Sequence, residues 1–346
     1  MRITANQVTL ARIFLLPVPA YMLIYGETVQ WWIAFGLFLI LGATDFVDGW
    51  MARREGPTRL GSLIDPMADK IFIAAIMLSM VATGVFGPWA ISALLLRELL
   101  MTALRSSVAF RREPIKTSTL AKLKTIIQMG GLGTIFLSIT LPSDVLIIVS
   151  LILALPFLAV VIYYLFVRKK MPFWAVPVFA CFILLALLAA FVKKELSLNI
   201  QMGIIIAITW ASALDYVVGT FKLFKRTGIN QGDWVRIFWS IIYGLFVCPL
   251  VAYFPIMVLP LLVSMSLEFG IGGIDNVAVA EKHIFSSWPF FISSLSGLIF
   301  ALVVNVMIFT HQAMGALALS LALALISAIN CGFMFYKNIE LFKRGA

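Results

Sequence analysis

Runs of about 20 apolar residues recur along the whole chain, and each is long enough to cross a hydrocarbon core of about 30 Å. Of the 346 residues, 62% are hydrophobic and 12% are charged, whereas about 25% of a soluble domain is charged. This composition excludes a water-soluble enzyme, a disordered regulator and a fibrous protein. The alternating segments of about ten residues that mark a transmembrane β-barrel are absent. The sequence therefore predicts an all-α, polytopic integral membrane helical bundle.

The apolar runs predict 11–12 transmembrane helices. The eleven clear spans are 7–25, 31–52, 61–82, 87–109, 119–140, 144–166, 172–192, 199–221, 236–254, 288–309 and 313–336. We interpret 255–268 as a further short or re-entrant piece, and 268–287, which contains three glycines, as a loop. Twelve crossings fit the charge pattern better than eleven, because they put the basic C-terminal tail in the cytoplasm.

The net charge of +10 comes from basic residues that cluster between apolar runs. They crowd 53–59, 105–124, 168–170 and 222–236, while 26–30, 83–87 and 141–145 lack them. The positive-inside rule then predicts a cytoplasmic N-terminus and a multi-pass protein of the cell (inner, cytoplasmic) membrane. Membrane lipids are the expected contacts of these loops. Nucleic acid is not an expected partner, because no basic stripe is interleaved with exposed aromatic residues on a soluble module.

Four aspartates within residues 42–70 are the chemically informative feature. Asp45 and Asp48 are three residues apart and Asp65 and Asp69 are four apart, so each pair shares one face of a helix. A short loop joins the two helices, which makes them antiparallel neighbours whose carboxylates can face each other. One aspartate inside a membrane helix costs about 2.5–3.5 kcal/mol. Four aspartates must therefore line a wet cavity or bind cations.

Carboxylates without histidine or cysteine form a hard oxygen site, which suits Mg²⁺, Mn²⁺ or Ca²⁺ and not zinc. The nearby Arg53, Arg54 and Arg59 offer groups that grip phosphate. Together they indicate metal-assisted chemistry on a phosphate or pyrophosphate. Gly49 and Gly61 remove side chains where helices or a ligand must approach closely, and simple helix packing remains the alternative.

The pattern Asp45-x2-Asp48-Gly49-x2-Ala52-Arg53, followed by Gly61-x3-Asp65-x3-Asp69, resembles the signature of the CDP-alcohol phosphatidyltransferases. These integral membrane enzymes move a phosphatidyl group from CDP-diacylglycerol to an alcohol and release CMP. All eight fixed positions of the motif are present. Seven residues separate Arg53 from Gly61, where the family usually has eight or nine, so the loop is one residue shorter.

Shorter stretches resemble the bacterial phosphatidylglycerolphosphate synthases within this family. They are Asn6-x2-Thr9-x2-Arg12, 64–70, 97–98, 103–105, 122–125 and 128–129. Residues 210–216 resemble the end of the sixth helix of those enzymes, which would make 144–192 an inserted helix pair. Otherwise 144–166 is the sixth helix. The resemblance implies a family-like membrane domain over 1–226, with additional membrane helices of unknown role over 227–346.

The resemblance implies a role for each matched residue. Asp45, Asp48 and Asp65 hold one or two Mg²⁺ or Mn²⁺ ions, with Asp69 also at the centre as the general base. Gly49, Ala52, Arg53 and Gly61 bind the nucleotide of CDP-diacylglycerol. A phosphorylated acceptor needs cations, and the candidates are Arg97, Arg105, Lys122 and Lys124. For Arg97 a structural ion pair to another helix is the alternative, because the adjacent Glu98 does not share its helix face.

Glycerol 3-phosphate is the expected acceptor, which would give phosphatidylglycerol phosphate and CMP. Inositol phosphate or serine are alternative acceptors for the same chemistry, and a homodimer is a further expectation from the family. Intramembrane prenyltransferases also use aspartates and Mg²⁺ on a pyrophosphate, but the spacing of the motif argues against them. A cation or lipid transporter remains the non-enzymatic alternative, because nothing after residue 226 matches the family.

Overall fold

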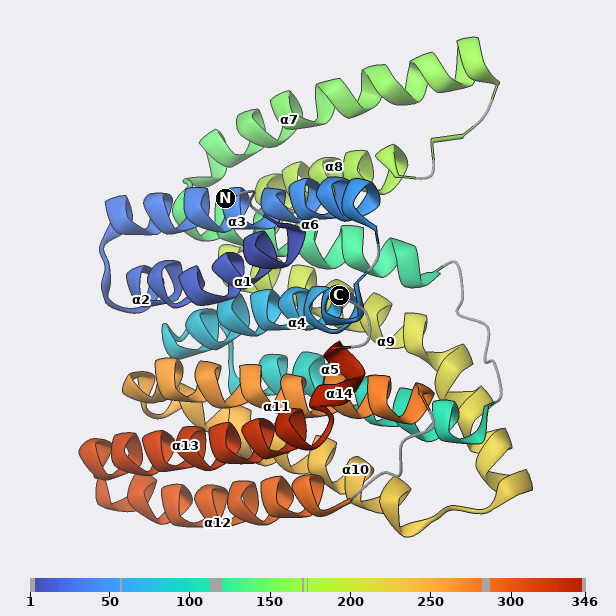
Figure 1. Ribbon diagram of the computed structural model, residues 1–346. Coiled ribbons are helices and arrows are strands. Elements are labelled where there is room, and N and C mark those ends of the chain that lie inside the picture. The colour runs from blue at the N-terminus through green and yellow to red at the C-terminus, as the bar shows by residue number, and fades with distance from the viewer. Residues whose placement is uncertain are drawn as a thin grey trace. The chain divides into compact units, whose positions relative to one another are not determined.

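The computed structural model describes residues 4–56, 58–112, 120–169, 171–172, 174–281 and 287–343. These residues form helices joined by short connections, and none of them lies in a β-strand (Figure 1). A helix pairs its backbone groups within its own segment, which a bilayer interior without water requires. The predicted all-α membrane bundle is confirmed.

Twelve helical segments follow one another along the described chain. The first six are α1 (Ala5–Leu15) with α2 (Pro17–Tyr25), α3 (Thr28–Glu55), α4 (Arg59–Ala82), α5 (Pro88–Arg111), α6 (Leu120–Thr140) and α7 (Ser143–Tyr163). The others are α8 (Ala175–Phe191), α9 (Lys194–Thr227), α10 (Gln231–Ile241) with its continuations η2 (Ile242–Val247) and η3 (Cys248–Ala252), α11 (Val258–Ala280), α12 (Trp288–Thr310) and α13 (Ala313–Lys337). A short helix, α14 (Ile339–Lys343), follows α13.

Eight helical stretches among the described residues are long and apolar enough to cross a membrane. Helices α4 and α5 are each 24 residues long, but both carry several charged side chains. They are also largely buried against other helices rather than exposed. This combination is typical of helices that form the inside of a bundle and carry its polar groups.

The sequence-based interpretation of 255–287 is wrong in its main point. Helix α11 runs without interruption through Ala280, so 258–280 is a full-length helix and 268–280 is no loop. Its three glycines lie where α11 meets other helices closely. A Cβ at Gly272 would lie 2.7 Å from Thr102 Cγ2, and one at Gly273 would lie 2.6 Å from Leu63 Cδ1. In this membrane helix, the glycines therefore mark a packing face, where small residues let helices approach closely.

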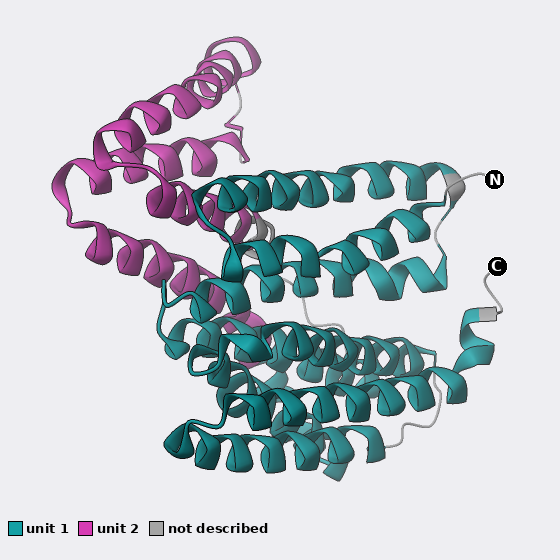
Figure 2. Ribbon diagram, turned by 90° about the vertical axis from the view of Figure 1, so that its left-hand side faces the viewer, with its two compact units in different colours: residues 1–115, 219–346 teal, residues 116–218 magenta. Residues whose placement is uncertain are grey.

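The chain folds into two compact units (Figure 2). One contains residues 1–115 and 219–346, and the other contains 116–218. In the first unit α11 packs on α4, α5 and α13, and α10 packs on α5. In the second unit α8 packs on α6 and α7. The helices after residue 226 thus share one core with α1–α5, while the division at residue 226 drawn from the resemblance stays a prediction.

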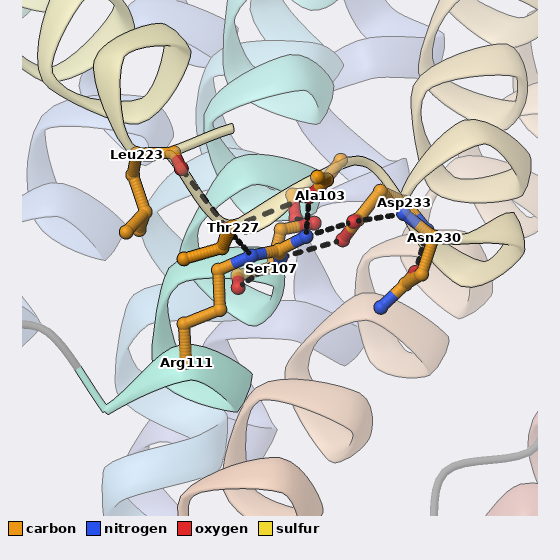
Figure 3. A network of polar contacts seen from close by, with 8 residues as sticks. Ala103, Ser107, Arg111, Leu223, Thr227, Asn230 and Asp233 are labelled. Atoms are coloured by element: carbon orange, nitrogen blue, oxygen red, sulfur yellow. Dashed lines mark hydrogen bonds and ion pairs between the residues drawn. The ribbon is translucent and has the colours of Figure 1, made fainter. Parts of the chain in front are cut away.

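An ion pair ties the end of α5 to the start of α10 (Figure 3). Arg111 donates from Nη1 to Asp233 Oδ1 at 3.1 Å and from Nη2 to Asp233 Oδ2 at 2.5 Å. The Asp233 side chain is fully buried, and it also accepts the backbone N–H of Asn230 at 3.0 Å. Arg111 Nε also donates a hydrogen bond to Thr227 Oγ1, at the end of α9, at 2.7 Å. One guanidinium therefore fixes three segments of the first unit.

Candidate active site

Helix α1 presents three polar residues along one face, at intervals of three residues. Asn6, Thr9 and Arg12 stand on an otherwise largely apolar helix, and this spacing places them on neighbouring turns. Thr9 is fully buried and Arg12 nearly so. Buried polar groups need hydrogen-bond partners. The partners of these three residues lie on α3, on α4 and at the residue that caps α4.

Arg12 is the point on which the aspartates converge. Its Nη1 lies 3.1 Å from Asp45 Oδ1 and 3.5 Å from Asp69 Oδ1, and its Nη2 donates to Asp48 Oδ2. Helix α3 supplies Asp45 and Asp48, and α4 supplies Asp69. One guanidinium therefore joins three helices through three carboxylates.

Thr9 brings the fourth carboxylate into the group. Its hydroxyl Oγ1 lies 2.8 Å from Asp48 Oδ2 and 3.3 Å from Asp65 Oδ1. Asp65 thus joins the carboxylates around Arg12 through the neighbouring threonine. The structure brings together all four aspartates that the sequence singles out.

The first turn of α4 is held against α1. Thr58 caps the helix, because its Oγ1 accepts the backbone N–H of Gly61 at 3.0 Å. Asn6 Nδ2 donates to the same Oγ1 at 3.2 Å. A Cβ at Gly61 would lie 2.9 Å from Thr58 Oγ1 and 3.0 Å from Asn6 Oδ1. Gly61 therefore lets α1 and α4 approach at the edge of the carboxylate group.

The four carboxylates differ in how far they are exposed. The side chains of Asp45 and Asp69 are 50% and 48% exposed, whereas that of Asp48 is 5% exposed. Arg12 Nε is buried and has no hydrogen-bond partner in the described part of the chain. Carboxylate oxygens converging on one cationic group are the donor set that Mg²⁺ and Mn²⁺ take. As these side chains stand, no three carboxylate, histidine or cysteine groups among the described residues surround one point.

The expected nucleotide-binding residues of α3 lie along its last two turns. Gly49 is open, since a Cβ there would meet only Arg53 Nη1, at 3.7 Å. Arg53 is exposed in the last turn, and Ala52 is half-buried. The Gly49 position is uncrowded, in contrast to the crowded position of Gly61.

The expected acceptor-binding residues are carried by α5 and α6. Arg97 is buried on α5, and its Nη1 donates to Glu98 Oε1 at 3.0 Å. The expectation that Glu98 cannot serve Arg97 is therefore wrong, because two long side chains can bend toward each other from adjacent positions. Arg105 is exposed on α5. Lys124 is half-buried on α6 in the second unit, and the side chain of Lys122 lies outside the described residues.

The sequence is similar to a known family and to several of its members. Residues 2–157 match the family described as CDP-alcohol phosphatidyltransferase. The chain is 30% identical over 138 residues to the CDP-diacylglycerol–glycerol-3-phosphate 3-phosphatidyltransferase of Rickettsia typhi, covering 40% of this chain and 78% of that one. It is 34% identical over 155 residues to a probable phosphatidylglycerophosphate synthase of Mycobacterium tuberculosis, covering 44% and 74%.

The chain belongs to the CDP-alcohol phosphatidyltransferase family.

The family match of this phosphatidyltransferase ends at residue 157, inside α7, so α8–α14 lie beyond it. The relative from Cereibacter sphaeroides, with the same name as the Rickettsia enzyme, is 31% identical, and the chain spans 62% of its length. No solved structure matches the chain. Helix α11 packs on α4 and α5, and α10 packs on α5, so helices beyond the family match pack on helices within it.

Three residues of this phosphatidyltransferase site were not among the site residues expected from the sequence. In the sequence, Asn6, Thr9 and Arg12 show only a resemblance to the start of the family sequence. The signal for a role was present, because polar residues recur at every third position of an apolar segment. What the sequence does not reveal is that this face of α1 points at the aspartates of α3 and α4.

Proposed function

We propose that the protein transfers the phosphatidyl group of CDP-diacylglycerol to glycerol 3-phosphate, giving phosphatidylglycerol phosphate and CMP. The names of the Rickettsia and Mycobacterium relatives support this acceptor. The observation that carries the proposal is the gathering of the four motif aspartates around Arg12 and Thr9. Such a group of carboxylates at a membrane boundary is expensive unless it binds cations.

We further propose that Asp45, Asp48, Asp65 and Asp69 hold one or two Mg²⁺ or Mn²⁺ ions. A bound ion supplies neutralisation of the pyrophosphate charge and stabilisation of the leaving CMP. The four carboxylates form an all-oxygen donor set, which supports this choice of metal. Arg12 serves as the counter-charge of the carboxylates in the metal-free protein.

Asp69 is the proposed general base. A hydroxyl attacks phosphorus poorly until its proton is removed, and the half-exposed Asp69 side chain can be reached by a small acceptor. The open face of α3 at Gly49, Ala52 and Arg53 would take the nucleotide, with Arg53 toward its phosphates. Gly61 would contribute through its backbone, because no side chain fits there.

The acceptor phosphate is assigned to Arg105, which is exposed on α5, with Arg97, Lys122 and Lys124 as further cations. The distribution of Lys and Arg supports an active site facing the cytoplasm in the inner membrane. A homodimer remains a proposal from the family resemblance.

The test is an acceptor screen with the purified full-length protein. Labelled CDP-diacylglycerol is mixed with glycerol 3-phosphate, inositol phosphate or serine in the presence of Mg²⁺, Mn²⁺ or EDTA. We expect metal-dependent CMP release with glycerol 3-phosphate, and a lipid product with the mass of phosphatidylglycerol phosphate. CMP release with another acceptor only would correct the substrate. Absence of CMP release with every acceptor would refute the proposed reaction.

A further inference from the structure

A carboxylate lies at the centre of the helices that the family match does not cover. Glu268 stands on α11, at the middle of the candidate membrane span Pro255–Ala280, and is fully buried. An ionisable residue at this depth costs about 2.5–3.5 kcal/mol and usually marks an ion or proton pathway. The proposed phosphatidyl transfer does not use it.

Glu268 is held by neutral donors alone. Its Oε2 accepts from Trp239 Nε1 at 2.7 Å. Its Oε1 lies within hydrogen-bonding distance of three hydroxyls, those of Ser327 at 2.7 Å, Tyr243 at 2.9 Å and Ser293 at 3.1 Å. In the part of the chain that the structure describes, no basic side chain forms an ion pair with Glu268. Asp233 and Asp275, which are also buried, are each paired with an arginine.

The hydroxyls form a continuous oxygen cluster with Glu268 Oε1. Ser264 Oγ lies 3.0 Å from Ser327 Oγ, and Tyr243 OH lies 3.5 Å from the same atom. The residues of the cluster come from η2, α11, α12 and α13, so helices surround it on several sides. Asn330 Nδ2 donates a hydrogen bond to Ser293 Oγ at 2.8 Å. This bond fixes the orientation of the serine hydroxyl.

The backbone is irregular beside the cluster. Tyr243 lies in the π-helical segment η2, which passes into the 3-10 segment η3. The irregular segment is packed tightly on α5, since a Cβ at Gly244 would lie 2.6 Å from Leu96 Cα. Interrupted helices inside a membrane commonly form ion sites, and π-helical turns are frequent at functional sites. The irregular helix and a buried carboxylate without an ion-pair partner among the described residues are two independent observations at the same place.

We propose that Glu268 Oε1 and the hydroxyls of Tyr243, Ser264, Ser293 and Ser327 form an intramembrane binding site for one Na⁺ ion. Five oxygens suit a hard cation. One positive charge cancels the charge of Glu268, whereas a divalent ion would leave a net charge in the membrane interior. These oxygens stand at hydrogen-bonding separations of 2.7–3.5 Å. An ion is admitted when the serine side chains move outward and the hydroxyls turn their lone pairs toward it.

The first test is the thermal stability of the purified full-length protein in detergent at pH 8. Melting is compared in NaCl, KCl and choline chloride at equal ionic strength. A ligand that binds only the folded protein raises the Tm, and we expect a Tm about 5 °C higher in NaCl than in choline chloride. Glu268→Gln removes the charge at constant shape and should abolish the Na⁺ effect. Glu195→Gln, at an exposed position on α9, is the matched control and should keep it.

The second test needs no variant and therefore covers the case in which Glu268→Gln does not fold. Dicyclohexylcarbodiimide modifies protonated carboxyl groups inside membranes, and the modification of Glu268 is read by mass spectrometry. We expect labelling to fall at least tenfold in NaCl relative to choline chloride, with KCl giving little protection. Ser327→Ala should raise the Na⁺ concentration needed for protection.

Three results overturn the proposal. The first is a Tm and a labelling level that are the same in all three salts. The second is a Na⁺ effect on the Tm that survives Glu268→Gln. The third is labelling that follows pH alone. None of these results bears on CMP release from CDP-diacylglycerol, so the failure of this site and the failure of the proposed enzymatic activity are distinguishable.

Discussion

Arg12 of α1 and Asp48 of α3 form a buried ion pair, with side-chain exposures of 2% and 5%. The same guanidinium contacts the half-exposed Asp45 and Asp69. In a buried pair, removal of one partner leaves an uncompensated charge, which costs more than the pair itself contributes. Arg12 is therefore the group on which the stability of the metal-free carboxylate site depends.

Arg12→Gln should lower the stability of the metal-free protein by about 3 kcal/mol, because Asp48 then lacks a counter-charge in a buried position. Thermal unfolding in EDTA measures the effect. Mn²⁺ should restore much of the lost Tm, since the ion takes the place of the guanidinium. Arg168→Gln, at an exposed position, is the control and should not change the Tm. Equal Tm values for Arg12→Gln and the native protein in EDTA would contradict the assignment.

Asp69→Asn should reduce kcat by about 10²–10⁴-fold, because general-base catalysis typically contributes this much. The KM for CDP-diacylglycerol should change little if the other three aspartates hold the metal. CMP release at saturating substrate measures the effect. Asp144→Asn, at an exposed position in the first turn of α7, is the matched control with native turnover. Full turnover by Asp69→Asn would remove the assigned base.

Gly61→Ala should destabilise the protein by about 1–3 kcal/mol, as overpacking does. The added Cβ would meet Thr58 Oγ1 at 2.9 Å and Asn6 Oδ1 at 3.0 Å, so the contact between α1 and the cap of α4 must open. Gly36→Ala on α3 is the control, because nothing lies within 4 Å of its Cβ position, and alanine favours a helix. Comparison of the two Tm values decides the prediction, which fails if Gly61→Ala is as stable as Gly36→Ala.

Asp233→Ala should lower stability by about 3–5 kcal/mol, because it leaves the Arg111 guanidinium without its carboxylate in a buried position. The double variant Arg111→Ala/Asp233→Ala should lose less than the sum of the two single variants. Unfolding of all four proteins in detergent gives the coupling energy. A coupling near zero would mean that the contact between α5 and α10 does not depend on this pair.

Several features of the fold and the site follow from local sequence. The helices and their approximate ends follow from runs of apolar residues of membrane-spanning length, because hydrocarbon imposes helix on any such run. The aspartate pairs follow from spacings of three and four residues, which fix a shared helix face. The prediction of a loop over 268–280 is wrong because glycine occurs both in loops and at close helix contacts. Only the presence of Thr102 and Leu63 opposite α11 distinguishes the two.

By itself, the sequence determined the all-α membrane class, the two pairs of aspartates and their chemical type. Only the tertiary structure decided that Arg12 and Thr9 hold those aspartates, and that α10 and α11 share a core with α4 and α5. The physical reason is the range of the interactions. Helix formation and the shared face of nearby residues are set within a few turns, whereas ion pairs and helix contacts depend on which faces of distant segments meet.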